Sequence, residues 1–274
     1  MIEGWKYYNH AAVPTCAPHE QPDIKPLEEE LVWSNIGGGT PLLARWTTDW
    51  DCDHETNWWY VIKDTPFDIA SLKSKRRYEI NKGNKNFDVR VIDPRSFKDE
   101  LFRVTVAAYS GWPEKYRPSV TKESIADAVQ QWQEQLVFGA YSKEDNMLQG
   151  YAIVEDHENY AAFSVLRTNP EAEKQGINAA MVDSILEKFR DRFHNGFYIC
   201  DGERSIRHET AFQDYLEKYF AFRKSYCKLN IKYKPGFGFA VKILYPFRKM
   251  IKGKSKIGSN VSGILKMEEI HRNS

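Results

Sequence analysis

The run Ala161-Ala162-Phe163-Ser164-Val165-Leu166 leads into Arg167-Thr168-Asn169-Pro170 and, a few residues on, into Gln175-Gly176-Ile177-Asn178-Ala179-Ala180. The first run is mostly apolar and predicts a buried strand. Beyond the polar residues, large apolar side chains recur every four positions and predict a long helix with one face against a sheet: Ile177, Met181, Ile185, Phe189 and Phe193. This strand–helix unit decides the fold.

Segments of the same two kinds continue on both sides of this unit. Further strands are predicted at residues 87–92, 136–141, 150–154, 197–200 and 227–233, and helices at 96–108, 121–132 and 210–220. Ser96 and Thr210 open capping boxes, and Thr121 is a favourable N-cap. The order β-α-α-β-β-β-α-β-α-β predicts an α+β fold with a mixed sheet over residues 86–235.

Two further regions flank this domain. Residues 1–85 form an N-terminal region with strand-like runs at 42–46 and 57–62. A helix is expected to begin at Asp68, a good N-cap residue, and to end at Gly83. Residues 236–274 form a basic C-terminal tail.

Composition and charge limit the kinds of ligand to expect. The 274 residues include 42% hydrophobic and 14% aromatic residues, enough apolar surface for a packed core. The net charge is +1, but residues 238–258 carry six positive side chains and no acid, while residues 259–274 are balanced. Residues 1–237 therefore carry a net charge of −5, which argues against nucleic acid as the main ligand of the body.

The cysteine spacing and the first residues of the sequence indicate a reducing compartment. The four cysteines lack CxxC spacing and are expected to be free thiols rather than a disulfide framework or a zinc site. No metal is predicted. No run of about 20 apolar residues predicts a membrane span, and the first residues lack the pattern of a secretory signal. We therefore expect a cytoplasmic protein.

Two segments resemble the GNAT superfamily of acyltransferases. Residues 166–180 are similar to the segment that binds the coenzyme A diphosphate in this family, and residues 212–233 are similar to its penultimate helix and last strand. The resemblance implies that acyl-CoA lies beside the strand at 163–167 with its diphosphate on the start of the next helix. The cofactor-binding residues it implies are Val165, Leu166, Arg167, Gln175, Gly176, Ile177, Asn178 and Ala179. The start of a helix favours an anion in any protein, because its first N–H groups lack partners, and Gly176 allows a phosphate to approach the backbone closely.

Several positions depart from the family's pattern. Glu173 stands where a neutral or positive residue is expected, and Asn178 replaces a small residue. The tyrosine that often serves as general acid would fall at Glu217. Tyr215 and Tyr219 are its near neighbours, and Tyr219 is the catalytic candidate.

The basic segment at residues 72–82 resembles a helix of the FemABX and BioF2-like branch. Members of that branch carry a partly degenerate copy of the fold ahead of the complete one, so residues 1–85 are expected to be a partial second copy. Their donors include aminoacyl-tRNA as well as acyl-CoA. Arg76 or Arg77 is a candidate for binding a phosphate, because a guanidinium group can bind it with two hydrogen bonds. The alternative is a charged helix that simply faces solvent.

A polar loop follows the predicted strand at 197–200. Asp201, Glu203 and His208 are candidates for the general base that deprotonates an acceptor, and Arg204 is a candidate for binding the substrate or a phosphate. Trp112, between the first two helices, is a candidate for contacting the acceptor. The alternatives are a solvated loop with an Arg–Glu pair and a packing role for the tryptophan.

The tail region at residues 239–256 mixes apolar and basic side chains, as segments that lie on an anionic membrane surface do. Pro246 would interrupt a helix there. Docking of the tail on the acidic body is the alternative, and membrane contact would place the protein at the inner face of the membrane.

These observations together favour an N-acyltransferase that moves an acyl group from acyl-CoA to an amine or hydroxyl acceptor, for example an amino sugar of a cell-envelope precursor. One alternative is FemABX-like transfer of an aminoacyl group from tRNA. The other is a catalytically inert GNAT-like protein with a binding or scaffold role. Nucleic acid is an expected partner only in the tRNA alternative.

Overall fold

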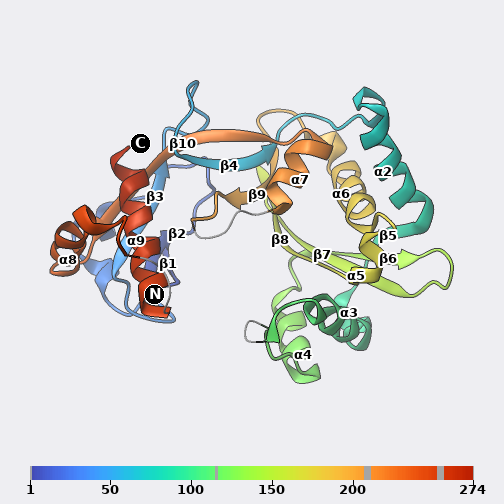
Figure 1. The fold of residues 1–274 in the computed structure, drawn as a ribbon, viewed down its shortest axis with the longest axis horizontal. Helices are drawn as coiled ribbons and strands as arrows, with labels where there is room; N and C mark the ends of the chain where they lie inside the picture. Colours follow the sequence, from blue (N-terminus) through green and yellow to red (C-terminus); the bar gives the residue numbers. More distant parts are fainter. Residues whose placement is uncertain (1, 115–116, 207–210, 252–255, 274) are drawn as a thin grey trace. The chain divides into compact units, whose positions relative to one another are not determined.

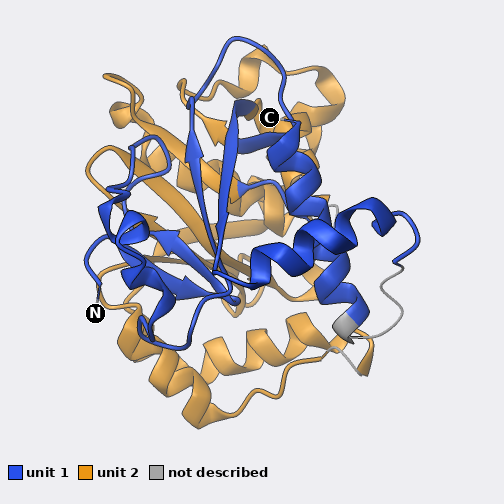
Figure 2. Ribbon diagram, turned by 90° about the vertical axis from the view of Figure 1, so that its left-hand side faces the viewer, with its two compact units in different colours: residues 1–60, 203–210, 224–274 blue, residues 61–202, 211–223 orange. Residues whose placement is uncertain are grey.

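The computed structural model describes residues 2–114, 117–206, 211–251 and 256–273. The chain forms two compact units. Unit 1 comprises residues 1–60, 203–210 and 224–274, and unit 2 comprises residues 61–202 and 211–223 (Figure 2). The boundary predicted between residues 85 and 86 lies inside unit 2.

Unit 2 is built around a mixed sheet, whose strands follow the order β9-β8-β7-β6-β5. Their bounds are β5 (Phe87–Val91), β6 (Leu136–Ser142), β7 (Leu148–Asp156), β8 (Tyr160–Thr168) and β9 (Tyr198–Glu203), the last ending at the first residue of a unit 1 segment. The pairs from β5 to β8 are antiparallel, whereas β8 and β9 run parallel. The predicted mixed α/β sheet is therefore confirmed.

Helices cover both faces of this sheet (Figure 1). On one face lie α3 (Lys98–Ser110) and α4 (Lys122–Gln131); on the other lies α6 (Ile177–Lys188), with α2 (Ser74–Asn86) packed against it. The described residues of this unit also form the helices η2 (Ile69–Ser71), η3 (Pro94–Ser96), α5 (Pro170–Glu173), η5 (Arg190–Arg192) and α7 (Ala211–Phe220).

Each face of the sheet has its own apolar core. On the α3–α4 side, Leu101, Val104, Ile125 and Val129 pack against Leu148, Tyr151 and Ile153. On the α6 side, the predicted apolar stripe is buried throughout: Ile177, Met181, Ile185, Phe189 and Phe193. Burial of such side chains contributes about 1.5–3 kcal/mol each relative to exposure, so the stripe fixes which face of α6 meets the sheet.

Three expected helix starts differ from the structure or lie outside it. Asp68 caps η2 rather than a long helix, since its side chain accepts a hydrogen bond from the Ala70 amide. The predicted capping box at Ser96 is wrong, because Ser96 lies in η3 and no side chain caps α3 at Phe97. The cap at Thr121 is confirmed, with Ser124 completing a capping box. Thr210 lies outside the described residues.

The helix α2 continues past Gly83 to Asn86, so the expected stop at this glycine is wrong. Gly83 instead allows α2 to touch the start of α6. A Cβ at Gly83 would lie 2.3 Å from the carbonyl oxygen of Gly176, and a Cβ at Gly176 would lie 2.9 Å from the Gly83 backbone. Lys82 and Asn86 donate side-chain hydrogen bonds to the carbonyls of Lys174 and Gln175, at 2.6 and 3.0 Å. The two glycines thus define a close helix–helix contact.

We expect Gly83→Ala to destabilise unit 2 by about 2 kcal/mol or more, because the new methyl group meets backbone that cannot rotate away. The better helix propensity of alanine, about 1 kcal/mol, offsets only part of this cost. Urea denaturation followed by circular dichroism measures the change. Gly111→Ala is the control, since its Cβ would enter open space at a φ of −76°. Equal stability of both variants would contradict the close contact.

Unit 1 contains the strands β1 (Trp5–Tyr8), β2 (Ala11–Pro14), β3 (Leu43–Thr48), β4 (Trp58–Lys63) and β10 (Arg223–Tyr233), of which β4 continues into unit 2 and β10 begins at its last residue. β1 and β2 form an antiparallel hairpin, β2 lies parallel to β3, and β3 lies antiparallel to β10. The helices are α1 (Lys25–Glu28), η1 (Leu31–Trp33), α8 (Phe237–Leu244), η6 (Tyr245–Phe247) and α9 (Lys256–Arg272).

The C-terminal helix α9 is part of the unit 1 core. Ile270 is buried with Cys227 and Leu229 of β10, and the Tyr233 hydroxyl donates a hydrogen bond of 2.8 Å to Glu268. This end of the predicted tail therefore docks on the body. In the part of the chain that the structure describes, no helix is both long and apolar enough to cross a membrane.

Candidate active site

The strands β8 and β9 pair only near their starts. Tyr160, Ala161 and Ala162 lie opposite Tyr198, Ile199 and Cys200, and the register ends there. β8 continues for six more residues, and its pairing with β7 on the other side includes a bulge at Ser164, because Ile153 faces Val165 while Val154 faces Phe163. Over the described ranges of the chain, the backbone groups of residues 163–168 that point toward β9 therefore have no strand partner, and such an open edge accepts an extended ligand.

A cavity of about 290 Å³ opens where the strands separate. It is lined by residues of β8, by the first turns of α5–α6 and α7, and by one residue of β9: Phe163, Ser164, Val165, Leu166, Thr168, Glu173, Asn178, Asp201 and Phe212. Asp201 is the residue that directly follows the last paired residue of β9. A carboxyl group therefore lies at the point where the sheet opens.

The environment of Asp201 changes its ionisation. Burial away from water raises the pKa of this carboxyl to about 7, and a hydrogen bond from the Gln213 side chain opposes the shift only in part. Desolvation disfavours the charged carboxylate, so the proton is held more tightly than in water. A carboxyl that loses its proton near neutral pH suits a general base. Asp201 was one of three residues predicted for this role.

A second cavity, of about 360 Å³, borders the same stretch of β8. It shares Ser164, Val165, Leu166, Thr168 and Glu173 with the first cavity and adds Ala108, Tyr109, Trp112 and Arg167. The exposed indole of Trp112 packs edge-on against Tyr109, with ring centroids 5.1 Å apart. Trp112 thus lines the second cavity, and its role in contacting the acceptor remains a prediction.

Arg167 provides the positive charge of the second cavity. Its guanidinium lies 5.0 Å from the Tyr109 ring centroid and donates a hydrogen bond of 2.7 Å to the Tyr151 hydroxyl. Tyr151 in turn is hydrogen-bonded to Thr105 at 2.8 Å. Within the described residues no carboxylate pairs with Arg167. The guanidinium is therefore held in place while its charge is available to an anion.

The start of α6 has uncapped amides that favour an anion, but a nearby carboxylate disfavours one. Gly176 adopts a φ of 90°, and no side chain caps the helix, so its first amides lack a capping partner. The Thr168 hydroxyl lies 3.3 Å from Glu173 Oε1 and 3.2 Å from Asn178 Oδ1, and both side chains line the first cavity. The Glu173 carboxylate places negative charge where a diphosphate is predicted to bind.

The predicted cofactor residues are divided between the cavity and the core. Val165, Leu166 and Asn178 line the first cavity, and Arg167 lines the second. Ile177 and Ala179 are buried, Gln175 is exposed, and Gly176 contacts α2. Ile177 and Ala179 could therefore bind a phosphate only through their backbone amides, as could Gly176, which has no side chain.

Glu203 lies in unit 1 and forms an ion pair with Arg45, and its other oxygen lies 3.4 Å from the Tyr60 hydroxyl. The Arg45 side chain is only 12% exposed. The neighbouring residue Arg204 stacks on Trp59, 4.2 Å from its ring centroid, and donates a hydrogen bond of 2.7 Å to the Asn57 carbonyl. Both side chains hold unit 1 together, and their predicted roles in the reaction remain predictions.

The other predicted site residues lie away from the two cavities or outside the structure. Tyr219 is on α7 with its ring 4.9 Å from that of Tyr215, whose pKa is raised by burial. Arg76 and Arg77 lie in the first turn of α2, and Arg77 is within 3.4 Å of the Ala70 carbonyl. His208 lies outside the described residues.

Sequence reasoning missed Phe212, Thr168 and Ser164 as lining residues. Ser164 lies in the strand at 163–167 that is predicted to bind the donor, and Thr168 directly follows this strand. A polar side chain in or next to an apolar strand was the signal that could have identified both residues. Phe212 had no such signal, because an aromatic residue on a helix predicts packing equally well. In the described residues, no group of three or more His, Cys, Asp or Glu side chains could hold a metal ion.

Comparisons with known proteins identify the fold. No family model matches the sequence, and no curated protein matches it. Among solved structures, L-PGS from Bacillus licheniformis is similar with a TM-score of 0.51 and 13% identity, over 89% of this chain and 84% of that one. The C-terminal domain of a protein assigned as a lysylphosphatidylglycerol synthetase from Agrobacterium fabrum gives a TM-score of 0.52 and 12% identity, over 88% and 84%. A conserved protein of unknown function from Bacteroides thetaiotaomicron gives 0.50 and 13%, over 81% and 78%.

Proposed function

We propose that this protein transfers an acyl or aminoacyl group to an amine or hydroxyl acceptor, with Asp201 as the general base. The observation that carries the proposal is the half-buried carboxyl of Asp201, which lines the cavity at the gap between β8 and β9 and whose pKa is raised by burial to about 7. The fold shared with the C-terminal domain of a protein assigned as a lysylphosphatidylglycerol synthetase supports group transfer of this kind. Fold alone does not name a substrate, so the chemistry is argued from the site.

In the proposed reaction, the acceptor's N–H or O–H proton passes to the Asp201 carboxylate. The acceptor nitrogen or oxygen forms a bond to the donor's carbonyl carbon, and the bond from that carbon to the donor's sulfur or oxygen breaks. The leaving group then takes up a proton. The unpaired edge of β8 supplies backbone groups that orient the donor and polarise its carbonyl.

For the donor, we propose acyl-CoA lying along residues 163–167 with its diphosphate at the first amides of α6. Arg167 would bind an anionic group of the donor or the acceptor, since a fixed guanidinium forms strong hydrogen bonds to phosphate and carboxylate. Trp112 and Tyr109 would provide the apolar wall of the acceptor site.

An aminoacyl donor is the second candidate. A lysyl group is named in one of the structures with this fold, and α2 presents the basic side chains that a tRNA would need. Lys75, Arg76, Arg77 and Lys82 lie within its first nine residues. The FemABX-like assignment, with residues 1–85 as a partial second copy, belongs to this candidate. A catalytically inert binding protein is the third possibility that the test below separates.

The test is ligand binding by the whole chain. Acetyl-CoA, a long-chain acyl-CoA or free coenzyme A at about 100 times its dissociation constant should raise the stability by about 2.7 kcal/mol. A thermal shift with any thioester supports the first candidate. Binding of aminoacyl-tRNA alone, with strong salt dependence that is reduced by Arg76→Glu with Arg77→Glu, supports the second. No stabilisation by any donor contradicts the proposed function.

We expect Glu173→Gln to bind coenzyme A about two- to fivefold more tightly than the wild type. The variant removes a negative charge beside the predicted diphosphate position, and such a partly solvated charge contributes about 0.5–1 kcal/mol. Isothermal titration calorimetry measures the dissociation constants. The matched control is Glu171→Gln, an exposed residue of the same short helix that lines neither cavity. Equal affinities for the wild type and both variants would place the diphosphate elsewhere.

A further inference from the structure

The chain after β10 exposes a row of large apolar side chains in unit 1. Phe239 is 70% exposed, Ile243 51%, Phe247 53% and Met250 77%. They come from α8, η6 and the turn that follows. Few soluble surfaces collect so many exposed apolar side chains over so short a segment without a use for them.

These residues follow one another along a segment that changes from α-helix to 3-10 helix and then to a turn. Leu244, Tyr245 and Arg248 all have right-handed helical backbone angles, and the amides of Arg248 and Met250 donate hydrogen bonds to the carbonyls of Tyr245 and Phe247. The α-helix α8 ends at Leu244, two residues before Pro246, as the sequence predicted, and the chain continues as the 3-10 helix η6 and a turn. Phe239 and Ile243 are four residues apart in α8, about one α-helical turn, and Phe247 and Met250 are three residues apart, about one 3-10 turn, so the two members of each pair lie on the same side of their own segment.

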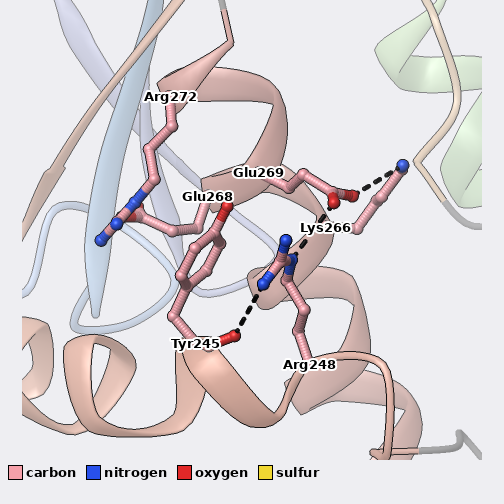
Figure 3. Close-up of polar contacts among 6 residues, drawn as sticks. All are labelled: Tyr245, Arg248, Lys266, Glu268, Glu269 and Arg272. Carbon is pink, nitrogen blue, oxygen red and sulfur yellow. Dashed lines mark hydrogen bonds and ion pairs between the residues drawn. The ribbon is translucent and has the colours of Figure 1, made fainter.

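The opposite face is fixed to α9 (Figure 3). Val241 is buried, and Tyr245 lies between two guanidinium groups, with the Cζ atoms of Arg248 and Arg272 at 4.3 and 4.0 Å from its ring centroid. Arg248 also donates a hydrogen bond of 3.2 Å to Glu269. The apolar row is thus held outward by packing on its other side.

The charged residues beside these apolar side chains indicate which kind of partner the surface can bind. Lys242 and Lys249 are exposed, and each directly precedes one of the exposed apolar residues, Ile243 and Met250. Residues 238–258 contain six positive side chains and no acid. An apolar strip with a basic border and no acidic residue complements the surface of a bilayer that contains anionic lipids.

We propose that the face formed by Phe239, Ile243, Phe247 and Met250, with Lys242 and Lys249 beside it, docks on an anionic membrane surface. The apolar side chains enter the boundary between headgroups and acyl chains, and the lysines bind the anionic headgroups. The docking is peripheral and does not depend on the catalytic proposal, because no residue of the cavities takes part in it.

The test uses the full chain and vesicles of phosphatidylcholine, with or without about one third phosphatidylglycerol, in sedimentation assays. We expect binding to the anionic vesicles that falls at least tenfold between low and high salt, as screening predicts, and little binding to pure phosphatidylcholine. Phe239→Glu with Met250→Glu should lose at least tenfold in partitioning. Lys242→Gln with Lys249→Gln should bind less tightly and with a weaker salt dependence.

The matched control is Val106→Glu with Met147→Glu, which replaces two equally apolar, exposed side chains of unit 2. Circular dichroism melting shows that each variant is folded, and the control should bind vesicles like the wild type. Three results would overturn the proposal: no binding to anionic vesicles, equal loss in the control, or a wild-type dimer that Phe239→Glu with Met250→Glu converts to a monomer. The last result would make the face an interface between copies of this chain.

Discussion

Asp201→Asn should lower the transfer rate by about 10²- to 10⁴-fold, the usual contribution of a positioned general base. Asparagine keeps the size of the side chain and its hydrogen bond to Gln213, but it cannot accept the acceptor's proton. The measurement is release of the donor's thiol with the donor that shifts the melting temperature and a panel of primary amines and alcohols. In the wild type the rate should rise with pH up to about 7, as Asp201 loses its proton, and this limb should be absent from the variant.

Asp201→Asn should lower the transfer rate but raise the free energy of unfolding at alkaline pH. The pKa of Asp201 is about 7 in the folded chain, against 3.8 as its ordinary value. The folded state therefore binds the proton more tightly than the unfolded state, and the wild type loses stability as the pH rises from about 4 to about 7. Asp201→Asn carries no such penalty, so it should be more stable than the wild type at pH 8 and similar to it at pH 4.

A matched variant separates this effect from the loss of any surface acid. Asp214→Asn changes an exposed carboxylate in the first turn of α7 and should leave both the rate and the pH dependence of stability unchanged. If Asp201→Asn retained the wild-type rate, Asp201 would not be the base. Denaturant titrations at pH 4 and pH 8 supply the second, independent readout.

Glu203→Gln should destabilise the protein by about 2–3 kcal/mol, because it leaves the buried guanidinium of Arg45 without its partner. The loss is smaller than for a fully buried pair, since the Glu203 side chain is 30% exposed. Urea denaturation measures the change. Activity per folded molecule should remain near that of the wild type, whereas a catalytic Glu203 would lose activity far beyond its loss of stability.

A double variant tests the physical reason. Arg45→Met with Glu203→Gln removes the buried charge together with its partner, so it should recover most of the stability lost in Glu203→Gln alone. A double variant as unstable as the sum of the two single variants would mean that the ion pair is not the cause. The double-mutant cycle then measures the coupling between the two residues directly.

The elements of unit 2 could be predicted from the sequence because their patterns are local. The four-residue stripe from Ile177 predicted α6, and all five strands from β5 to β9 were predicted in place, although the predicted ranges of β7, β8 and β9 were shorter than the observed strands. Helix starts were less certain, because Ser96 satisfies the capping pattern yet lies in a tight turn capped by Asp93. Gly83 resembles a helix stop, but its partner Gly176 is distant in the sequence and makes a close helix contact instead.

Site residues could be predicted from the sequence only where a local pattern, such as the end of a strand, places them. Asp201 was identified because it follows a buried strand, but its raised pKa depends on its burial in the folded chain, where it lines a cavity with residues such as Phe163 and Phe212 that no local pattern connects to it. Glu203 looked equivalent, two residues along the same strand. Gly202 lies between them with a φ of +88°, so the regular alternation of side chains is interrupted, and Glu203 meets Arg45 instead.

The interleaved path of the chain through unit 1 has a consequence for its synthesis. The strand β3 has β10 as its antiparallel neighbour, and the ribosome adds β10 only after every residue of unit 2 has been made. Unit 2 can fold while translation continues. The strand β3 in residues 1–60, in contrast, can pair with β10 only after residues 224–233 have been synthesised. A premature stop codon before residue 224 would therefore leave the amino-terminal hairpin exposed to chaperones and proteases, even though it lies upstream of the lesion.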